Sequence, residues 1–215
     1  MKSLILKDLY NIGHNTKSML FMLAVLAVVL IPTSGASAYI IVSALLCSMM
    51  IMTTFTFDEN SNWSRYAMIM PVSKKDVVIG KYIVLVIFCV IGSLFGLVIG
   101  LIAELAMSKN AFNLISIIEL LFLTLLALTI SFISGSMSIP LVFKFGAERA
   151  RVLLIVSILI PLAICFGSYQ VLVLLGIELT DQLVFILLCG SPIIALLWGY
   201  MMYRICCRVF EKQEL

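Results

Sequence analysis

Long apolar runs separated by short polar segments make up most of this chain. Six of these runs approach or exceed the roughly 20 residues that a helix needs to cross a hydrocarbon core. None of them shows the strict alternation of apolar and polar residues that a membrane barrel requires. The pattern therefore predicts an all-α membrane protein with six transmembrane helices, at residues 18–36, 38–57, 82–103, 118–143, 152–175 and 183–203.

Composition and charge placement extend this prediction to orientation. Hydrophobic residues make up 63% of the chain and charged residues only 12%, which excludes an ordinary water-soluble domain. Of the 14 Lys and Arg residues, only Lys109 lies on the far side of the predicted membrane. The positive-inside rule then places both termini and the two larger loops in the cytoplasm. The net charge of +3 has the same origin, so it does not indicate a nucleic-acid partner.

Residues 1–17 precede the first run and are predicted to form an amphipathic interfacial helix, followed by a transmembrane domain at 18–215. The expected apolar face consists of Met1, Ile5, Leu6, Leu9 and Ile12. The expected polar face consists of Lys7, Asp8, Asn11, His14 and Asn15. A solvated, partly ordered tail is the alternative.

The polar insert at residues 58–81 is the largest interruption between two spans. Asn62 can cap a short helix that carries Trp63 and Tyr66 on one face, and Pro71 ends that helix. Residues 73–76, Ser-Lys-Lys-Asp, have the pattern of a capping box that starts the next helix. An amphipathic helix at this place predicts a docking partner, although Trp63 and Tyr66 could instead anchor the chain at the membrane surface.

The residues that catalysis or metal binding would need are missing from the spans. His14 is the only histidine and precedes the first span, so no histidine-based metal site or serine–histidine pair is expected inside the membrane. Gly80-Lys81 is followed by Tyr82 and lacks the glycine of a phosphate-binding loop. The sequence therefore predicts no catalytic residue, no metal site and no nucleotide site in this chain.

Three features inside the spans concern packing and the transport path. Gly92, Gly96 and Gly100 recur every four residues, which predicts a close helix contact, within the chain or with another subunit. Pro140, Pro161 and Pro192 interrupt three spans and predict kinks, either static or moving. Glu119 is the only acid inside an apolar run, and it is compatible with a short outer turn, a wet cavity on the substrate path or a proton relay.

Two cytoplasmic segments together resemble a known family. The second insert, 144–151, lies in the sequence Ile-Pro-Leu-Val-Phe-Lys-Phe-Gly-Ala-Glu-Arg-Ala-Arg at 139–151, and the first contains Phe57-Asp58-Glu59-Asn60 and Gly80-Lys81-Tyr82. Both segments, with the length and the six spans, resemble type-2 ABC exporter permeases, a bacterial group whose nearest branch is similar to the permeases of phenol-soluble modulins.

This resemblance implies a half-transporter in the bacterial plasma membrane that pairs with a second copy or a related permease. A separate cytoplasmic ABC ATPase would bind ATP and Mg, the N-terminal helix would be the family's elbow helix, and the first insert would be its coupling helix. The residues that would contact the ATPase are Asp58, Glu59, Trp63, Arg65, Tyr66, Pro71, Lys74, Lys75, Lys144, Gly146, Glu148, Arg149 and Arg151.

The expected cargo is an amphipathic, cationic peptide or a similar hydrophobic toxin, exported from the cell. The spans are rich in Met, Phe and Leu and almost free of charge, which suits an apolar cargo better than an ion or a sugar. The alternatives are a substrate-binding subunit of a vitamin importer, an intramembrane enzyme, and an ATP-independent immunity or scaffold protein.

Overall fold

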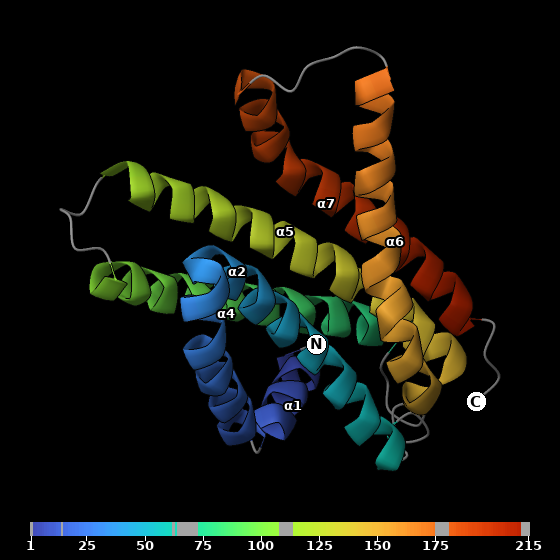
Figure 1. Ribbon diagram of the computed structural model, residues 1–215. Helices are drawn as coiled ribbons and strands as arrows, with labels where there is room; N and C mark the ends of the chain where they lie inside the picture. The colour runs from blue at the N-terminus through green and yellow to red at the C-terminus, as the bar shows by residue number, and fades with distance from the viewer. Residues whose placement is uncertain are drawn as a thin grey trace.

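The computed structural model describes residues 2–13, 15–61, 63, 73–107, 114–174 and 181–211, and the regular structure in these ranges is α-helical. The helices are α1 (Lys2–Gly13), α2 (Thr16–Asn60), α4 (Lys74–Met107), α5 (Leu114–Phe145), α6 (Ala147–Leu174) and α7 (Asp181–Glu211). Figure 1 shows them as one helical bundle without a sheet among the described residues. This confirms the predicted all-α class.

Four of the described helices are long and apolar enough to cross a membrane: α2, α4, α5 and α7. Among the described residues of α6, the apolar helical stretch is shorter, at Leu154–Ile164. The predicted number of six counts α2 as two spans and α6 as one. The number of six spans therefore stays a prediction. It depends in part on whether the two arms of α2 are separate spans.

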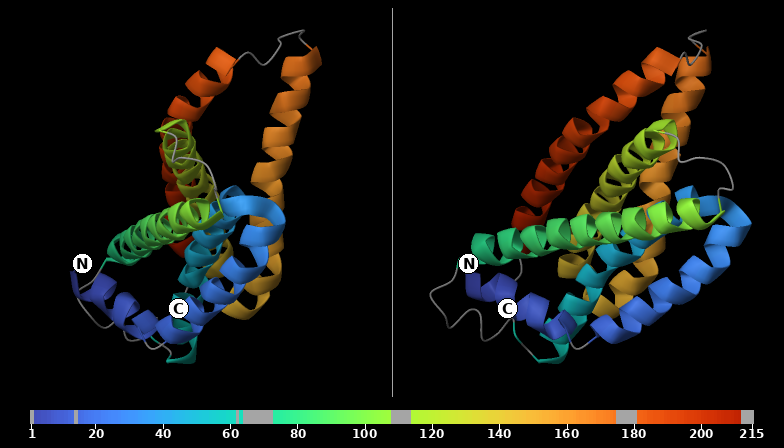
Figure 2. Two further views of the ribbon diagram at one scale, coloured as in Figure 1. Left: turned by 60° about the vertical axis from the view of Figure 1, so that its left-hand side comes forward. Right: turned by 90° about the vertical axis from the view of Figure 1, so that its left-hand side faces the viewer.

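Helix α2 is bent sharply at Gly35, where φ is +84° and ψ is 170°. Figures 1 and 2 both show its two arms running back toward the same end of the molecule. The Tyr39 hydroxyl donates a hydrogen bond of 3.3 Å to the Leu23 carbonyl. In a straight helix these residues would be about 24 Å apart along the axis, so the contact requires the chain to fold back. A positive φ suits glycine, which explains the position of the bend.

One end of the bundle collects the ends of most helices, and we call it the charged end. Here the ring of Phe143 near the end of α5 lies 5.1 Å from Phe55 of α2 and 4.7 Å from Phe210 of α7. Lys74, at the start of α4, donates to the Phe210 carbonyl at 3.4 Å. The Gly35 bend and the far ends of α4 and α5 lie away from it (Figure 1).

The start of α4 has the capping box that the sequence predicts. The Asp76 amide donates to Ser73 Oγ at 3.1 Å, and the Ser73 amide donates to Asp76 Oδ2 at 3.4 Å. The two bonds satisfy amides that a helix start otherwise leaves without a partner. The short helix predicted from Asn62 to Met70, with its stop at Pro71, lies outside the described residues apart from Trp63.

The glycine repeat of α4 faces the second arm of α2. A Cβ atom at Gly92 would lie 2.5 Å from Cys47 Cβ, and one at Gly96 would lie 3.1 Å from Ile40 Cα and overlap the Ser43 hydroxyl. Gly100 faces the Ile40 side chain in the same way. The Ser43 hydroxyl also lies 3.3 Å from the Gly92 carbonyl, to which it can donate. The repeat therefore serves a contact within the chain, where missing side chains let two helices approach closely.

Helix α5 runs without a break from Leu114 to Phe145. The outer turn considered for Glu119 is therefore wrong: this residue is helical and exposed. At about 1.5 Å per residue the helix is roughly 48 Å long, so it can exceed the hydrocarbon core without an interruption. Pro140 removes the bond that the Ser136 carbonyl would receive, and the buried Tyr82 hydroxyl of α4 donates to this carbonyl at 3.3 Å.

Removing the Tyr82 hydroxyl should therefore weaken the contact between α4 and α5. We expect Tyr82→Phe to lower the free energy of unfolding by about 1 kcal/mol, since the Ser136 carbonyl loses its donor in a buried place. In the Pro140→Ala background the helix can supply its own donor, so the same change should have little effect. Thermal unfolding of the four proteins in one detergent measures this difference; equal losses in both backgrounds would contradict the explanation.

Helix α6 is the least integrated element. It packs on α5 and α2, and among the described residues it has no contact with α7. Of its described side chains, only Leu154 packs against the main hydrophobic core, which is built from α1, α2, α4, α5 and α7. Farther along, Leu159, Leu162 and Phe166 are all exposed. These positions, at i, i+3 and i+7, share one face of the helix, so this part of α6 presents an apolar face to its surroundings.

Candidate functional site

Lys81 of α4 lies at the centre of a buried polar site at the charged end, and only 3% of the residue is exposed. Its ammonium nitrogen is 2.6 Å from Asp58 Oδ2, 2.9 Å from Asp8 Oδ2 and 3.1 Å from Thr54 Oγ1. A lysine has three N–H donors, and these oxygens provide one acceptor for each. The site therefore joins α4 to α1 through Asp8 and to the last turns of α2 through Asp58 and Thr54.

A second lysine completes the arrangement. Lys7 Nζ contacts Asp58 Oδ1 and lies 3.3 Å from Asp8 Oδ1. Each ammonium group is thus paired with both carboxylates, and the signs alternate around a closed ring of Lys7, Asp8, Lys81 and Asp58. We call these four residues the charge ring. Because the ring is neutral as a whole, burying it avoids the large desolvation cost of an uncompensated charge.

Aromatic side chains cover the charge ring. The Lys81 ammonium lies 4.7 Å from the centre of the Phe55 ring, and the Lys7 ammonium lies 4.2 Å from the centre of the Trp63 ring. Both distances are within the range of cation–π attraction. One side of Trp63, near the start of the insert at residues 58–81, is therefore already occupied by α1.

In the structure, Asp8 lies on the buried face of the N-terminal helix, whereas the sequence predicts it on the polar face. Asp8 is only 3% exposed, whereas Leu6, placed on the predicted apolar face, is exposed. Ile5, Asp8, Leu9 and Ile12 follow the spacing i, i+3, i+4, i+7 of a single helical stripe. The predicted position of Asp8, opposite the apolar face, is wrong, because Asp8 lies within this stripe and its buried charge is compensated by Lys7 and Lys81.

Several residues predicted to contact an ATPase lie at the charged end but are engaged within the chain. Asp58 is buried in the charge ring, so its carboxylate does not reach the surface. Glu59 Oε1 would lie 3.2 Å from a Cβ at Gly146, whose φ of +80° forms the turn between α5 and α6. This proximity brings the end of α2 next to the turn between α5 and α6. Lys75 and Lys144 are exposed there.

The remaining predicted contacts cannot be placed in the same detail. Arg65, Tyr66 and Pro71 lie outside the described residues, and of Glu148, Arg149 and Arg151 the structure describes only that they are helical, in the first turns of α6. Sequence reasoning gave no site role to Lys7, Asp8, Thr54 or Lys81. The usable signal was an acid within the apolar stripe of α1, which implies a cationic partner elsewhere.

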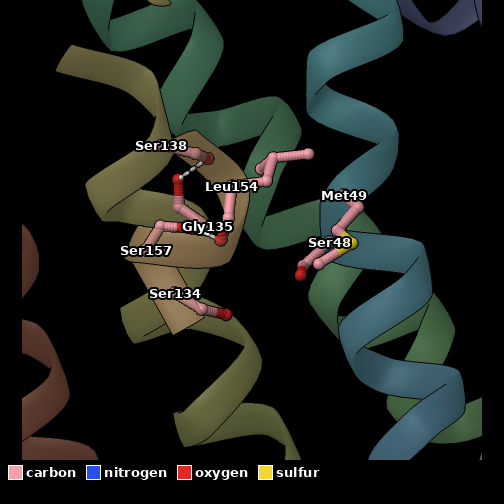
Figure 3. Close-up of a pocket in the computed structure, with 7 residues that line it drawn as sticks. All are labelled: Ser48, Met49, Ser134, Gly135, Ser138, Leu154 and Ser157. Atoms are coloured by element: carbon pink, nitrogen blue, oxygen red, sulfur yellow. Dashed lines mark hydrogen bonds between the residues drawn. The ribbon is translucent and has the colours of Figure 1, made fainter. Parts of the chain in front are cut away.

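A small pocket lies deeper in the bundle, between α2, α5 and α6 (Figure 3). It is too narrow to admit a water molecule and is lined by Ser48, Met49, Ser134, Gly135, Ser138, Leu154 and Ser157. The four serine hydroxyls donate to carbonyls of their own helices, as Ser138 does to Gly135 at 2.6 Å and Ser157 to Leu154 at 2.7 Å. The hydroxyls are thus satisfied without bonds between helices, and α6 approaches the bundle through small side chains.

Metal chemistry has no visible basis in the described ranges, where no three His, Cys, Asp or Glu side chains are grouped to hold an ion. The charge ring has no nucleophile next to a base, and its two carboxylates are occupied by ammonium groups. What the ring can do is mechanical: it fixes three helices to one another at the place where the first insert begins.

Comparison with known families gives one result. A family model described as "ABC-2 family transporter protein" matches residues 3–211. The match runs from α1 to the last residue of α7 and so includes the charge ring, the glycine repeat and both inserts, at 58–81 and 144–151. The chain has no match among curated proteins or among solved structures.

Proposed function

Since a match over nearly its whole length shows that the chain belongs to the ABC-2 family of transporter proteins, we propose that it is the permease of an ATP-driven exporter. Members of this family are the membrane subunits of ABC transporters, so ATP hydrolysis belongs to a separate ATPase chain. The extent of the match, together with four helices able to cross a membrane, is the observation that carries the proposal.

The charged end is proposed to face the cytoplasm and to receive the ATPase. The asymmetric distribution of Lys and Arg supports this orientation. The contact between Glu59 and the Gly146 turn supports a shared docking surface, because it brings the ends of both inserts to one place. Exposed Lys75 and Lys144 would contribute to that surface, together with the predicted coupling helix at 62–71.

Two further proposals concern the membrane part. The chain is proposed to cross the membrane six times, with the two arms of α2 as separate spans joined at Gly35, and with α6 as another. It is also proposed to pair with a second copy or a related permease. The apolar outer half of α6, which no other described helix covers, supports such a pairing.

The proposed cargo is an amphipathic, cationic peptide or a similar hydrophobic toxin. Between the two ends of the bundle, the buried polar groups of the described residues are serine, threonine and tyrosine hydroxyls and the Trp198 indole N–H, without a buried charge. Such an interior offers no coordination for a small ion but suits an apolar face of a helix. Glu119 is exposed near the outer end of α5, where it could meet a cationic cargo as it leaves.

Reconstitution of the complex tests the function. The tagged chain should copurify with an ABC ATPase, and vesicles containing the complex should hydrolyse ATP. A cationic amphipathic helical peptide should raise this hydrolysis several-fold, whereas a scrambled peptide of equal composition and charge should not. Absence of an ATPase would contradict the permease function, and equal responses to both peptides would contradict the peptide cargo alone.

A further inference from the structure

The charge ring connects elements that the transport function would need to move together. Asp58 is in the last turn of α2, two residues before the helix ends, and Lys81 is two turns into α4. The insert proposed to dock on the ATPase lies between them. Lys7 and Asp8 come from the middle of α1. The ring therefore surrounds both places where the insert enters the membrane domain and adds a third helix to them.

Stability alone is a poor explanation of such a ring. Apolar side chains of similar volume are often as stable as a buried ion pair, or more stable, because no charge has to be desolvated. Charges differ from apolar side chains in demanding one geometry: here each ammonium needs both carboxylates within about 3 Å. A ring of this kind fixes the positions of three helices relative to one another, whereas apolar contacts alone demand no single geometry.

The residue after Lys81 extends the connection to the rest of the bundle. The Tyr82 hydroxyl donates to the Ser136 carbonyl of α5, and its ring packs edge-to-face against Tyr203 of α7 at 5.9 Å. One turn of α4 thus holds α1 and α2 through Lys81 and holds α5 and α7 through Tyr82. A displacement of this turn is passed to four helices.

We propose that the charge ring locks α1, the end of α2 and the start of α4 into one rigid body that carries movement of the first insert into the membrane domain. Helix α1 is then a working part of ATP coupling rather than only a surface anchor, and Asp8 and Lys81 are positioning residues. This inference rests on the proposed function, because the movement comes from the ATPase.

The test uses the complete complex in vesicles, with Asp8→Asn as the main variant because it keeps the shape of the side chain. Lys81→Met is the second variant, and Lys17→Met is the control, since Lys17 is an exposed lysine near the same end. Two quantities are measured: stimulation of ATP hydrolysis by the cationic amphipathic peptide, and amide hydrogen exchange in residues 2–13 and 74–85, with and without trapping by ATP and vanadate.

In the wild-type complex and in Lys17→Met, trapping should change exchange in α1 and in the start of α4 together. In Asp8→Asn, α1 should exchange faster and no longer respond to trapping. Unstimulated ATP hydrolysis should stay within about 2-fold of wild type, while stimulation by the peptide falls at least ~5-fold, the effect of losing a coupling of the usual size. Lys81→Met should show the same pattern more strongly.

The possible failures are distinguishable. A wild-type complex without ATP hydrolysis overturns the proposed function and this inference with it. If the wild type responds but Asp8→Asn keeps wild-type stimulation, the lock is overturned and the permease function stands. Faster exchange in α1 without loss of stimulation assigns the ring a purely structural role and also overturns the lock.

Discussion

Replacing Gly96 by leucine should separate α4 from α2 and prevent the protein from folding into a stable bundle. The first atom of any side chain there would lie 3.1 Å from Ile40 Cα and would overlap the Ser43 hydroxyl. A backbone atom cannot rotate away as a side chain can, so the two helices have to move apart. Overpacking of a tight contact usually costs 1–3 kcal/mol, and here we expect a loss of about 3 kcal/mol or more.

The same substitution at Gly190 is a matched control, because this glycine is also within a helix but has no atom within 4 Å of an added Cβ. Gly190→Leu should accumulate in membranes and remain monodisperse in detergent, whereas Gly96→Leu should aggregate or melt at a much lower temperature. Similar melting temperatures for the two variants would show that the α2–α4 contact is looser than described.

The second large effect is expected at Asp58. Asp58→Asn leaves Lys7 and Lys81 with a single carboxylate, so the charge ring becomes a buried site with one excess positive charge. Breaking a buried ion pair by removing one partner typically costs about 3–5 kcal/mol. Glu59→Gln, a neutralised carboxylate one residue away at an exposed position, should cost less than about 1 kcal/mol.

A double substitution separates excess charge from the loss of one hydrogen bond. Asp58→Asn combined with Lys7→Met leaves the Asp8–Lys81 pair, which is neutral again. This variant should regain part of the lost stability, a non-additivity expected for residues that share one network. The free energies can be compared by chemical unfolding in detergent. If the two losses add, neutrality of the ring is not what stabilises it.

Features of the fold that depend on neighbouring residues were predictable from the sequence. The capping box at Ser73 and Asp76 needs only a spacing of three residues, and its two hydrogen bonds are present. The glycine repeat needs only a spacing of four, and the sequence could tell that a helix would approach it. Which helix approaches, and that it comes from the same chain, depends on how the spans pack and had to come from the structure.

The charge ring depends on residues that are far apart in the sequence. Lys7 and Asp58 are separated by 51 positions, and no periodicity connects them. The position of Lys81 near the end of a span was interpreted as a sign of membrane orientation. That interpretation says nothing about which residue pairs with it. The bend in α2 was expected as a break between the spans at 18–36 and 38–57, but a single glycine with positive φ achieves the reversal while the flanking residues stay helical.

The wide sequence separation within the charge ring has a consequence for how the protein is made. Lys7 and Asp8 leave the ribosome well before Lys81, which follows only after the whole of α2. At 5–20 residues per second, several seconds pass before the ring can close. During this time Asp8 stays hydrated, and the exposed Leu6 and Tyr10 side chains of α1 can hold it at the lipid surface. A nascent chain interrupted before Lys81 lacks the ammonium that pairs with both Asp8 and Asp58, so the ring cannot close and α1 has no charged partner on α4.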